Sequence, residues 1–370
     1  MAYKNVSLNI GNRLKNILHF NKMTRNRVAG IMRVKNDGMF IERCIESCIN
    51  ALDELIVVHN DCTDNSVEEI EKMIEKYPDK IRRYEYPHRV MGVGLTKEEY
   101  DFVKDLPEGS PYLLSTYCNF ALAKVTATYA LKIDADQVYF TDILMEWCDF
   151  IRNCVPQKKT VRVFIGKMFD KYFSLYRLLS LKFDRVLPLL PTWLLKLFYQ
   201  AYLSYAKYAF SHDEACFSMS GVNVLETDPL MIPMGHQVGN MVSGIPFNGE
   251  GDTVMFKITD STHFAKMPDY SIRKESIVEQ FVHPYKVMYV GFFWTHIRVM
   301  RPSSYTQAMN ILKADPGSYI SYGEFKGLSY NEIIKRSSKD IFRTVQRVLF
   351  SFIYKANKQS LMGSLDNMGY

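Results

Sequence analysis

The sequence predicts an open α/β fold in which a mostly parallel sheet is flanked by helices. Short apolar runs at residues 28–34, 54–60 and 81–87 have the length and composition of strands. The segments between these runs repeat apolar residues every three or four positions, as helices with one buried face do. Strands that alternate with helices form parallel sheets with right-handed crossovers, and such sheets bind ligands beyond the carboxyl ends of their strands. We therefore expect functional residues just after the strands.

The elements can be justified in chain order. The run VAGIMRV at residues 28–34 is followed by KNDG, which is typical of a strand that ends in a loop. Ile41, Ile45, Ile49 and Leu52 then give a helix one apolar face. After the second strand, Ser66 and Glu69 have the spacing of a capping box and predict that a helix starts there.

The pattern changes after the third strand. Residues 88–113 contain three Gly and two Pro, which predicts an inserted loop with a short helix at most. A helix over residues 114–129 is expected next, and it leads into the strand YALKIDAD. Thr141 is then expected to cap another helix, in which Leu144, Trp147, Cys148 and Ile151 share a face.

Composition limits the possible partners and the compartment. The 370 residues are 47% hydrophobic and 23% charged, as in ordinary globular proteins, and the net charge of +6 favours an acidic partner. A phosphorylated small molecule and an anionic membrane both fit, whereas nucleic acid is not expected, because no known binding module is present. The seven Cys are scattered and odd in number, which predicts free thiols in a reducing cytoplasm. The first residues lack the apolar core of a secretory signal.

Two carboxylates stand where an apolar strand ends, in LKIDADQVYF at residues 131–140. Asp134 and Asp136 are two residues apart, and such positions of a strand point to the same side. Unpaired carboxylates there would repel each other, and a divalent cation such as Mg²⁺ or Mn²⁺ would relieve this while keeping positions open for phosphate oxygens. On the residues alone, the alternative stays open that Asp134 caps a turn and Asp136 is solvated.

The order of these pieces resembles a known family. Residues 30–66 followed by residues 117–136 are similar to the nucleotide-diphospho-sugar glycosyltransferases of the GT-A fold, most closely the inverting family 2 group. The resemblance covers residues 28–140 and implies a Rossmann-like domain with added amphipathic helices, which uses Mn²⁺ or Mg²⁺. It assigns roles to matching residues: Arg33, Lys35 and Asn36 border the nucleobase, Asn60 and Asp64 stand at the turn after the second strand, Asn119 precedes the D-x-D strand, and Asp134 with Asp136 holds ribose and metal. One departure is that the second-strand turn begins with His59 and Asn60 rather than Asp.

Inverting transfer also needs a carboxylate that removes the proton of the acceptor hydroxyl. The stretch IPFNGEGDTVMFKI at residues 245–258 resembles the acidic motif of the family, so Asp252 is the expected base and Glu250 the second candidate. We expect a helix to begin at Thr253, and its N-terminus would keep the carboxylate ionised. The alternative is that Asp252 merely caps this helix.

Several enzymes of this fold take a further metal ligand from a histidine late in the chain. His296, beside Trp294 and before Arg298 and Arg301, is the expected ligand, because this neighbourhood suits both a metal and a diphosphate. His263 and His283 are weaker candidates.

Two segments combine aromatic and basic residues, at 158–210 and 339–358. Interrupting prolines and polar residues argue against a membrane span in the first segment. Basic residues interspersed with Leu, Phe, Tyr and Trp are typical of helices that lie on a membrane surface. The alternative is that these faces pack on each other or on a second subunit.

These observations predict a metal-dependent inverting glycosyltransferase. It would move a sugar from a nucleoside-diphosphate donor, a UDP-sugar by preference, onto a cell-surface polysaccharide, a lipopolysaccharide or a lipid-linked saccharide precursor. We expect it in the cytoplasm, attached to the inner face of the cell membrane, with oligomerisation left open. The alternatives are a nucleotidyltransferase and a catalytically degenerate membrane-associated scaffold.

The predicted organisation has three parts. A basic extension is followed by the glycosyltransferase domain and a C-terminal helical region, at residues 1–27, 28–300 and 301–370. Within the domain we expect a nucleotide-binding half, an aromatic and basic helical insertion and an acceptor half, at residues 28–140, 158–210 and 211–300.

Overall fold

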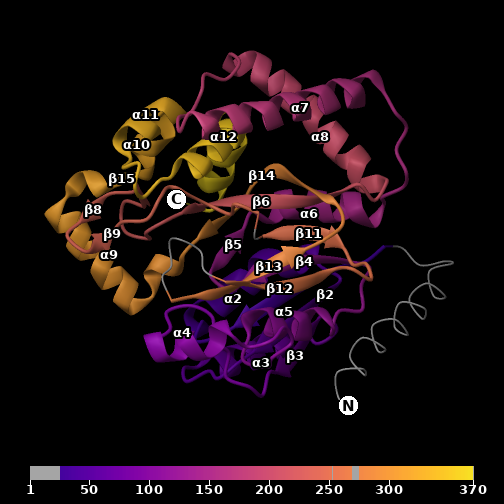
Figure 1. The fold of residues 1–370 in the computed structure, drawn as a ribbon, viewed down its shortest axis with the longest axis vertical. Helices are drawn as coiled ribbons and strands as arrows, with labels where there is room; N and C mark the ends of the chain where they lie inside the picture. Colours follow the sequence, from indigo (N-terminus) through magenta and orange to yellow (C-terminus); the bar gives the residue numbers. More distant parts are fainter. Residues whose placement is uncertain (1–25, 252, 269–274, 370) are drawn as a thin grey trace. The chain divides into compact units, whose positions relative to one another are not determined.

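The computed structural model describes residues 26–251, 253–268 and 275–369, and these form two compact units (Figure 1). Unit 1 contains the described residues up to Ala135, together with 144–154 and 255–286. Unit 2 contains residues 136–143, 155–254 and the chain from Val287 onwards. The predicted N-terminal extension lies almost entirely outside the described residues.

Unit 1 is built on a parallel sheet, as predicted. Strands β1 (Val28–Val34), β2 (Glu54–His59), β3 (Ile81–Glu85) and β4 (Tyr129–Asp134) pair in parallel in the order β3-β2-β1-β4. Strand β11 (Val254–Lys257) pairs antiparallel with β4. All six residues of β2 are buried, which explains its continuous apolar run. The mostly parallel α/β fold class is thus confirmed.

Five helices and a one-turn extension accompany these strands in the chain. They are α2 (Gly38–Cys48) with η1 (Ile49–Ala51), α3 (Ser66–Lys76), α4 (Lys97–Lys104), α5 (Leu114–Leu122) and α6 (Thr141–Arg152). The predicted capping box at the start of α3 is wrong. Ser66 is already the first helical residue, and its N–H donates to the Asp64 carboxylate at 3.0 Å. A capping box occurs instead in α4, between Thr96 and Glu99. Helix α5 also ends earlier than expected, at Leu122.

A hairpin of β12 (His263–Pro268) and β13 (Ile277–Val282) completes unit 1. The Asn119 side chain of α5 anchors it, because Nδ2 donates to the Phe264 carbonyl at 2.7 Å and Oδ1 accepts from the Phe264 N–H at 2.8 Å. This paired contact places β13, and with it Glu279, beside the ends of β1 and β4.

Unit 2 contains a second group of strands. Strands β6 (Ala215–Asn223), β14 (Lys286–His296) and β5 (Gln137–Tyr139) are neighbours in that order, and β10 (Phe247–Asn248) pairs with β6. Two small ladders join β7 (Met231–Pro233) to β15 (Tyr319–Ser321), and β8 (Gln237–Val238) to β9 (Met241–Val242). Short helices follow: η2 (Arg298–Met300), α9 (Pro302–Ala314), η3 (Pro316–Ser318), α10 (Tyr322–Gly327) and α11 (Tyr330–Arg336).

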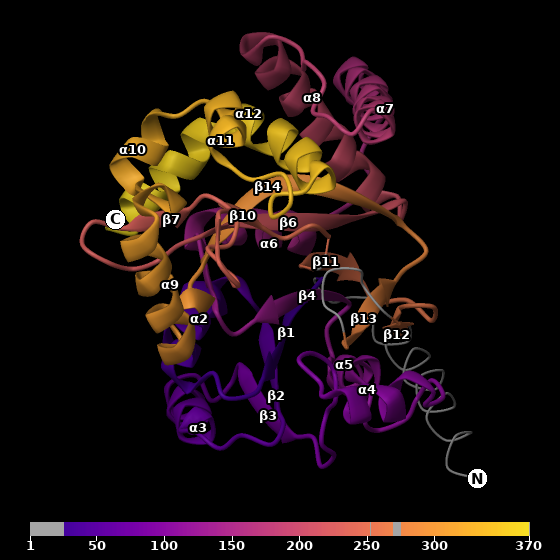
Figure 2. The same ribbon diagram turned by 60° about the vertical axis from the view of Figure 1, so that its left-hand side comes forward.

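Three long helices of unit 2 pack on one another, namely α7 (Val161–Lys182), α8 (Thr192–Ser211) and α12 (Thr344–Asn367) (Figure 2). The ring centroids of Phe173 and Phe352 are 4.1 Å apart, and Phe169 stacks on Phe198 at 5.6 Å. Gly166 permits the close approach of α7 and α8, because a Cβ there would lie 2.0 Å from the carbonyl oxygen of Ala201.

This packing corrects one expectation about the membrane. The apolar face of α12, which includes Leu349, Phe352 and Ile353, is buried inside unit 2. It therefore packs within the protein, as the alternative had it, and does not face a membrane. Among the residues that the structure describes, no helix has the length and apolarity needed to cross a bilayer.

Candidate active site

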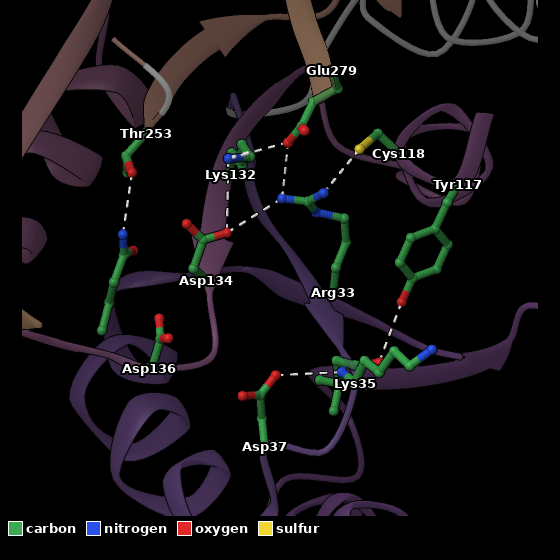
Figure 3. A network of polar contacts seen from close by, with 12 residues as sticks. Arg33, Lys35, Asp37, Tyr117, Cys118, Lys132, Asp134, Asp136, Thr253 and Glu279 are labelled. Atoms are coloured by element: carbon green, nitrogen blue, oxygen red, sulfur yellow. Dashed lines mark hydrogen bonds and ion pairs between the residues drawn. The ribbon is translucent and has the colours of Figure 1, made fainter. Parts of the chain in front are cut away.

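A cluster of four charged side chains lies at the carboxyl ends of β1 and β4 in unit 1. Arg33 and Asp134 are register partners on these strands, and Arg33 Nη2 lies 3.4 Å from Asp134 Oδ1. The same Nη2 is 3.1 Å from Glu279 Oε1 on β13. Lys132 Nζ lies 3.7 Å from Asp134 Oδ1 and 3.6 Å from Glu279 Oε1, so both cations reach both carboxylates (Figure 3).

This cluster balances its charges. Burial opposes the charge on Arg33, but Cys118, Glu279 and Asp134 raise the pKa of the guanidinium well above its ordinary value. Burial likewise opposes the ionisation of Glu279, yet the charges of Arg33 and Lys132 lower the pKa of that carboxyl. Arg33 and Glu279 are therefore charged at neutral pH, and the cluster as a whole sets two basic side chains against two acidic ones.

The expectation that the carboxylates of Asp134 and Asp136 lack cationic partners was wrong. Asp134 has cationic partners in unit 1, and Asp136 has its own in unit 2, where Arg301 Nη2 lies 3.6 Å from Oδ2. A metal ion is consequently not needed to neutralise Asp134, whose side chain is 32% exposed.

Of the residues expected to border the nucleobase, Arg33 belongs to the charged cluster, whereas Lys35 and Asn36 lie in the exposed loop after β1. Lys35 Nζ forms an ion pair with Asp61 Oδ2 at 3.2 Å. Asn36 has a positive φ of 56°, and its Oδ1 accepts from the Thr63 N–H at 2.7 Å. These contacts join the loop after β1 to the loop after β2, where the family resemblance places the base.

Three other predicted site residues bind backbone groups of the protein. Asn60 is buried, and its Nδ2 donates to the carbonyls of Tyr86 and His88 at 3.0 and 2.5 Å. Asp64 accepts from the N–H of Gly38 at the start of α2, at 3.0 Å, as well as from Ser66. Asn119 holds the β12–β13 hairpin. Hydrogen bonds lower the pKa of Asp64 despite its partial burial, so it is ionised at neutral pH.

In unit 2, Asp136 lies in the turn between β4 and β5 and faces His296 at the end of β14. Asp136 Oδ1 is 3.3 Å from His296 Nε2, and the Asp136 side chain is only 8% exposed. The Ile297 N–H donates to the Asp136 carbonyl at 2.9 Å, and His296 pairs with Gln137 in the β14–β5 ladder. The backbone of both strands thus fixes the two side chains opposite each other.

Asn223 determines which nitrogen of His296 carries the proton. Asn223 Nδ2 donates to the Ile245 carbonyl at 2.7 Å, so its Oδ1 is the atom that faces His296 Nδ1, also at 2.7 Å. A carbonyl oxygen only accepts, and Nδ1 must therefore be protonated. In the neutral ring the lone pair is then on Nε2, directed toward the Asp136 carboxylate. A proton or a metal ion can bridge these two atoms.

The surroundings keep Asp136 ionised. Burial opposes its ionisation, but a hydrogen bond and positive charge from His296, together with Arg298 and Arg301, lower the pKa of the Asp136 carboxyl to about 2. Among the described residues, no group of three or more His, Cys, Asp or Glu side chains is arranged to hold a metal ion. A cation at Asp136 and His296 would need further ligands from substrate or water.

A pocket of about 340 Å³ adjoins His296 in unit 2. His296 and Arg298 line it together with hydroxyl and amide groups, namely those of Asn223, Ser243, Ser304, Gln307 and Tyr319. Backbone and apolar groups from β7, β9 and α9 complete the wall. The mixture of hydrogen-bonding and apolar surface is typical of small-molecule sites.

The structure describes only one of the two candidates for the catalytic base. Asp252 itself lies outside the described residues. The helix expected after it is wrong, since residues 254–257 form strand β11, and the proposed effect of a helix N-terminus on Asp252 is withdrawn. Glu250 is described, and its carboxylate accepts from the Gln346 amide and lies 3.9 Å from Arg343 Nη2.

The two weaker candidates for a histidine metal ligand contact backbone carbonyls. His263 Nδ1 lies 2.8 Å from the Ser261 carbonyl, and His283 Nε2 lies 2.8 Å from the Lys257 carbonyl.

Sequence reasoning missed Lys132, Glu279 and Asn223. Lys132 carried a signal, because a lysine between apolar residues of a central strand needs a buried anionic partner. The other two carried none, since each acts on a residue far away in the chain.

Comparison with known proteins supports the expected class. Residues 20–177, less than half of the chain, match a family described as beta-1,4-N-acetylgalactosaminyltransferase (CgtA). No curated protein matches the chain. Residues 20–177 are thus similar to a glycosyltransferase family, as the sequence predicted for this part of the chain.

Solved structures of glucosyl-3-phosphoglycerate synthase from Mycobacterium tuberculosis are also similar. The complex with Mg²⁺ and UDP is 16% identical over 30% of this chain and 34% of that chain, with a TM-score of 0.19. The complex with Mn²⁺, UDP-glucose and phosphoglyceric acid gives the same values. The chain thus spans about one third of the length of these structures.

Proposed function

We propose that the protein transfers a sugar from a nucleoside diphosphate, by preference UDP, onto a saccharide acceptor with inversion, and that it uses Mn²⁺ or Mg²⁺. The observation that carries this proposal is the pair of Asp136 and His296 Nε2, 3.3 Å apart, beside Arg298 and Arg301. The matched family suggests N-acetylgalactosamine as the first donor sugar to test.

The residues present fit a cation that is shared with a substrate. A carboxylate and an imidazole nitrogen are both common metal ligands, and Mg²⁺ in particular is often held by one or two carboxylates plus substrate phosphates. Asp136 and His296 would hold the ion, and Asn223 orients the imidazole. When bound, the cation would neutralise charge on the departing diphosphate.

Other charged residues support the donor assignment. Arg301, next to Asp136, and Arg298, exposed at the pocket, would attract the diphosphate by charge-assisted hydrogen bonds. Asp134 is held by Arg33 and Lys132, which supports a role toward the ribose rather than the metal. The loops that carry Lys35 and Asn60 remain the proposed border of the nucleobase.

We assign the pocket beside His296 to the acceptor. Its hydroxyl and amide groups suit the hydroxyls of a saccharide, and its apolar wall suits the face of a sugar ring. Asp252 remains the proposed base and Glu250 the second candidate. A polysaccharide, lipopolysaccharide or lipid-linked precursor would be the acceptor, and a lipid-linked one would place the reaction at the inner face of the cell membrane.

The test is an assay of nucleotide release. A panel of UDP-sugars is incubated with the full chain and Mn²⁺, with EDTA or with EDTA followed by excess Mn²⁺, and free UDP is measured. We expect release with at least one donor, its loss in EDTA and its recovery with Mn²⁺. Asp252→Asn should bind donor normally but stop transfer to an acceptor.

Two results would favour the alternatives. A scaffold would release no UDP from any donor. A nucleotidyltransferase would release pyrophosphate when the chain is instead given a nucleoside triphosphate and a sugar phosphate, which phosphorus NMR can follow.

A further inference from the structure

Helix α7 is apolar on two opposite faces. Val163, Phe169, Phe173 and Tyr176 are buried on the face that packs on α8 and α12. On the other side Val161, Phe164, Met168, Leu175 and Leu178 are exposed, and their spacing of three, four or seven residues places them along one stripe. Phe164 and Leu178 are 65% and 64% exposed. This second stripe has no partner among the described residues.

Apolar side chains are also exposed at the start of α8, which packs on α7. Trp193 and Leu197 are 71% and 63% exposed, and α8 lies alongside α7 in both views (Figures 1 and 2). Phe183, just after α7, is also exposed. We call the outer stripe of α7 together with Phe183, Trp193 and Leu197 the α7 face.

Positive charge surrounds the α7 face. Residues 155–191 contain eight Lys or Arg and two acidic residues. Of the two acids, Asp170 is buried, and only Asp184 is exposed. Lys167 and Lys171 are exposed on α7 itself, next to Met168.

We propose that the α7 face docks on a bilayer that contains anionic lipids. Apolar side chains with tryptophan and phenylalanine would enter the interface, while the lysines would meet lipid phosphates. A symmetric contact between two copies of the chain would bring the same basic patch against itself, and this repulsion favours the anionic membrane as the occupant. The inference extends the proposed function, because it names the surface that would bring the enzyme to a lipid-linked acceptor.

Vesicle sedimentation tests the charge requirement. The full chain is spun with phosphatidylcholine vesicles, with and without about one third phosphatidylglycerol, in low salt. We expect binding only to the anionic vesicles and its weakening in 0.5 M salt. The double variant Lys167→Glu, Lys171→Glu should lose at least roughly 25-fold in affinity, since each lysine near the surface is worth about fivefold and the glutamates add repulsion. The control Lys97→Glu, Lys339→Glu makes the same charge change on exposed residues elsewhere and should bind within about twofold of the unmodified chain.

Trp193 gives a second test on the unmodified chain. The protein has three Trp, and Trp147 and Trp294 are buried, so a change in emission on lipid binding reports Trp193. Anionic vesicles should shift the emission to shorter wavelength, and brominated lipids should quench it. Trp193→Phe should remove both effects while vesicle binding persists.

Several outcomes would overturn the inference. Equal binding to neutral and anionic vesicles would do so, as would equal losses in the α7 and control variants or a Trp193 signal that does not change. A dimer in analytical ultracentrifugation without lipid, made monomeric by Leu175→Ser, Leu178→Ser, would assign the face to a second copy. The unmodified chain is also titrated with UDP and Mn²⁺, because intact donor binding together with absent binding to anionic vesicles rejects the membrane site alone and leaves the proposed function standing.

Discussion

Substitution of Asn223 tests the geometry of the proposed metal site without touching a ligand. In Asn223→Ala, His296 Nδ1 loses the acceptor that lies 2.7 Å away, and the imidazole is no longer held with its Nε2 lone pair toward Asp136. We expect weaker binding of Mn²⁺ in the presence of UDP, because an outer partner of a ligating histidine fixes both its tautomer and its orientation.

The expected size follows from the contact. Loss of such an outer partner usually lowers metal affinity by 10- to 100-fold, or about 1.4 to 2.7 kcal/mol. The short contact and the partial burial of His296, whose side chain is 17% exposed, place the effect toward the upper part of this range. Asn223→Asp keeps an oxygen acceptor at Nδ1 and should retain most of the affinity, since a carboxylate in this position also orients the ring.

The assay is electron paramagnetic resonance of free Mn²⁺ during titration with the full chain and saturating UDP. Asn153→Ala removes an exposed asparagine directly after α6 and serves as the matched control, with unchanged affinity expected. Thermal unfolding identifies any variant that has lost its fold. The reasoning is refuted if Asn223→Ala binds Mn²⁺ within a factor of two of the unmodified chain, or if Asn223→Asp falls as far as Asn223→Ala.

Two further predictions concern stability. Glu279→Gln leaves two buried cations with a single carboxylate and should lower the free energy of unfolding by about 3 kcal/mol at pH 7 in urea titrations. In the folded state the pKa of Glu279 is below its ordinary 4.5, so ionised Glu279 contributes to stability above that pH and the contribution is lost as the pH falls through the folded pKa. The unfolding free energies of the variant and the unmodified chain should therefore converge in acid. A difference between them that stays constant with pH would contradict this. Gly166→Ala should lower the stability by about 1 to 3 kcal/mol, because its Cβ would clash with the Ala201 carbonyl. Gly363→Ala, in open space on α12, should raise the stability by up to about 1 kcal/mol. Equal effects of the two variants in calorimetric melting would contradict the close packing of α7 on α8.

The parallel sheet of unit 1 could be predicted because its signals are local. Each strand is a short apolar run, and α2 and α3 repeat apolar residues at helical spacing. The helix that was wrongly predicted at residues 254–257 also reflects a local signal, because the run VMFK is too short for its periodicity to distinguish a strand from a helix. At the start of α3 the acceptor is Asp64 and not the expected Ser66. The sequence could not distinguish the two, because Asp and Ser are both common acceptors at the start of a helix.

The partners within the site could not be predicted, because they depend on the tertiary fold. Arg33 and Asp134 are 101 positions apart, and Asn223 and His296 are 73 apart. The same limit applies to the amphipathic helices. Phe352 and Phe164 both stand in aromatic, basic segments, yet the first is buried and the second is exposed. Composition indicates that such faces exist but not which of them the protein covers.

Isothermal calorimetry with UDP, with and without Mn²⁺, tests most directly whether Asp136 and His296 bind a cation together with the donor diphosphate. The unmodified chain should bind UDP at least tenfold more tightly with Mn²⁺ than with EDTA. Asp136→Ala and His296→Ala should each remove this gain and leave the metal-independent affinity in place. If Mn²⁺ strengthens UDP binding equally in both variants and in the unmodified chain, the cation is held elsewhere and the proposed site is wrong.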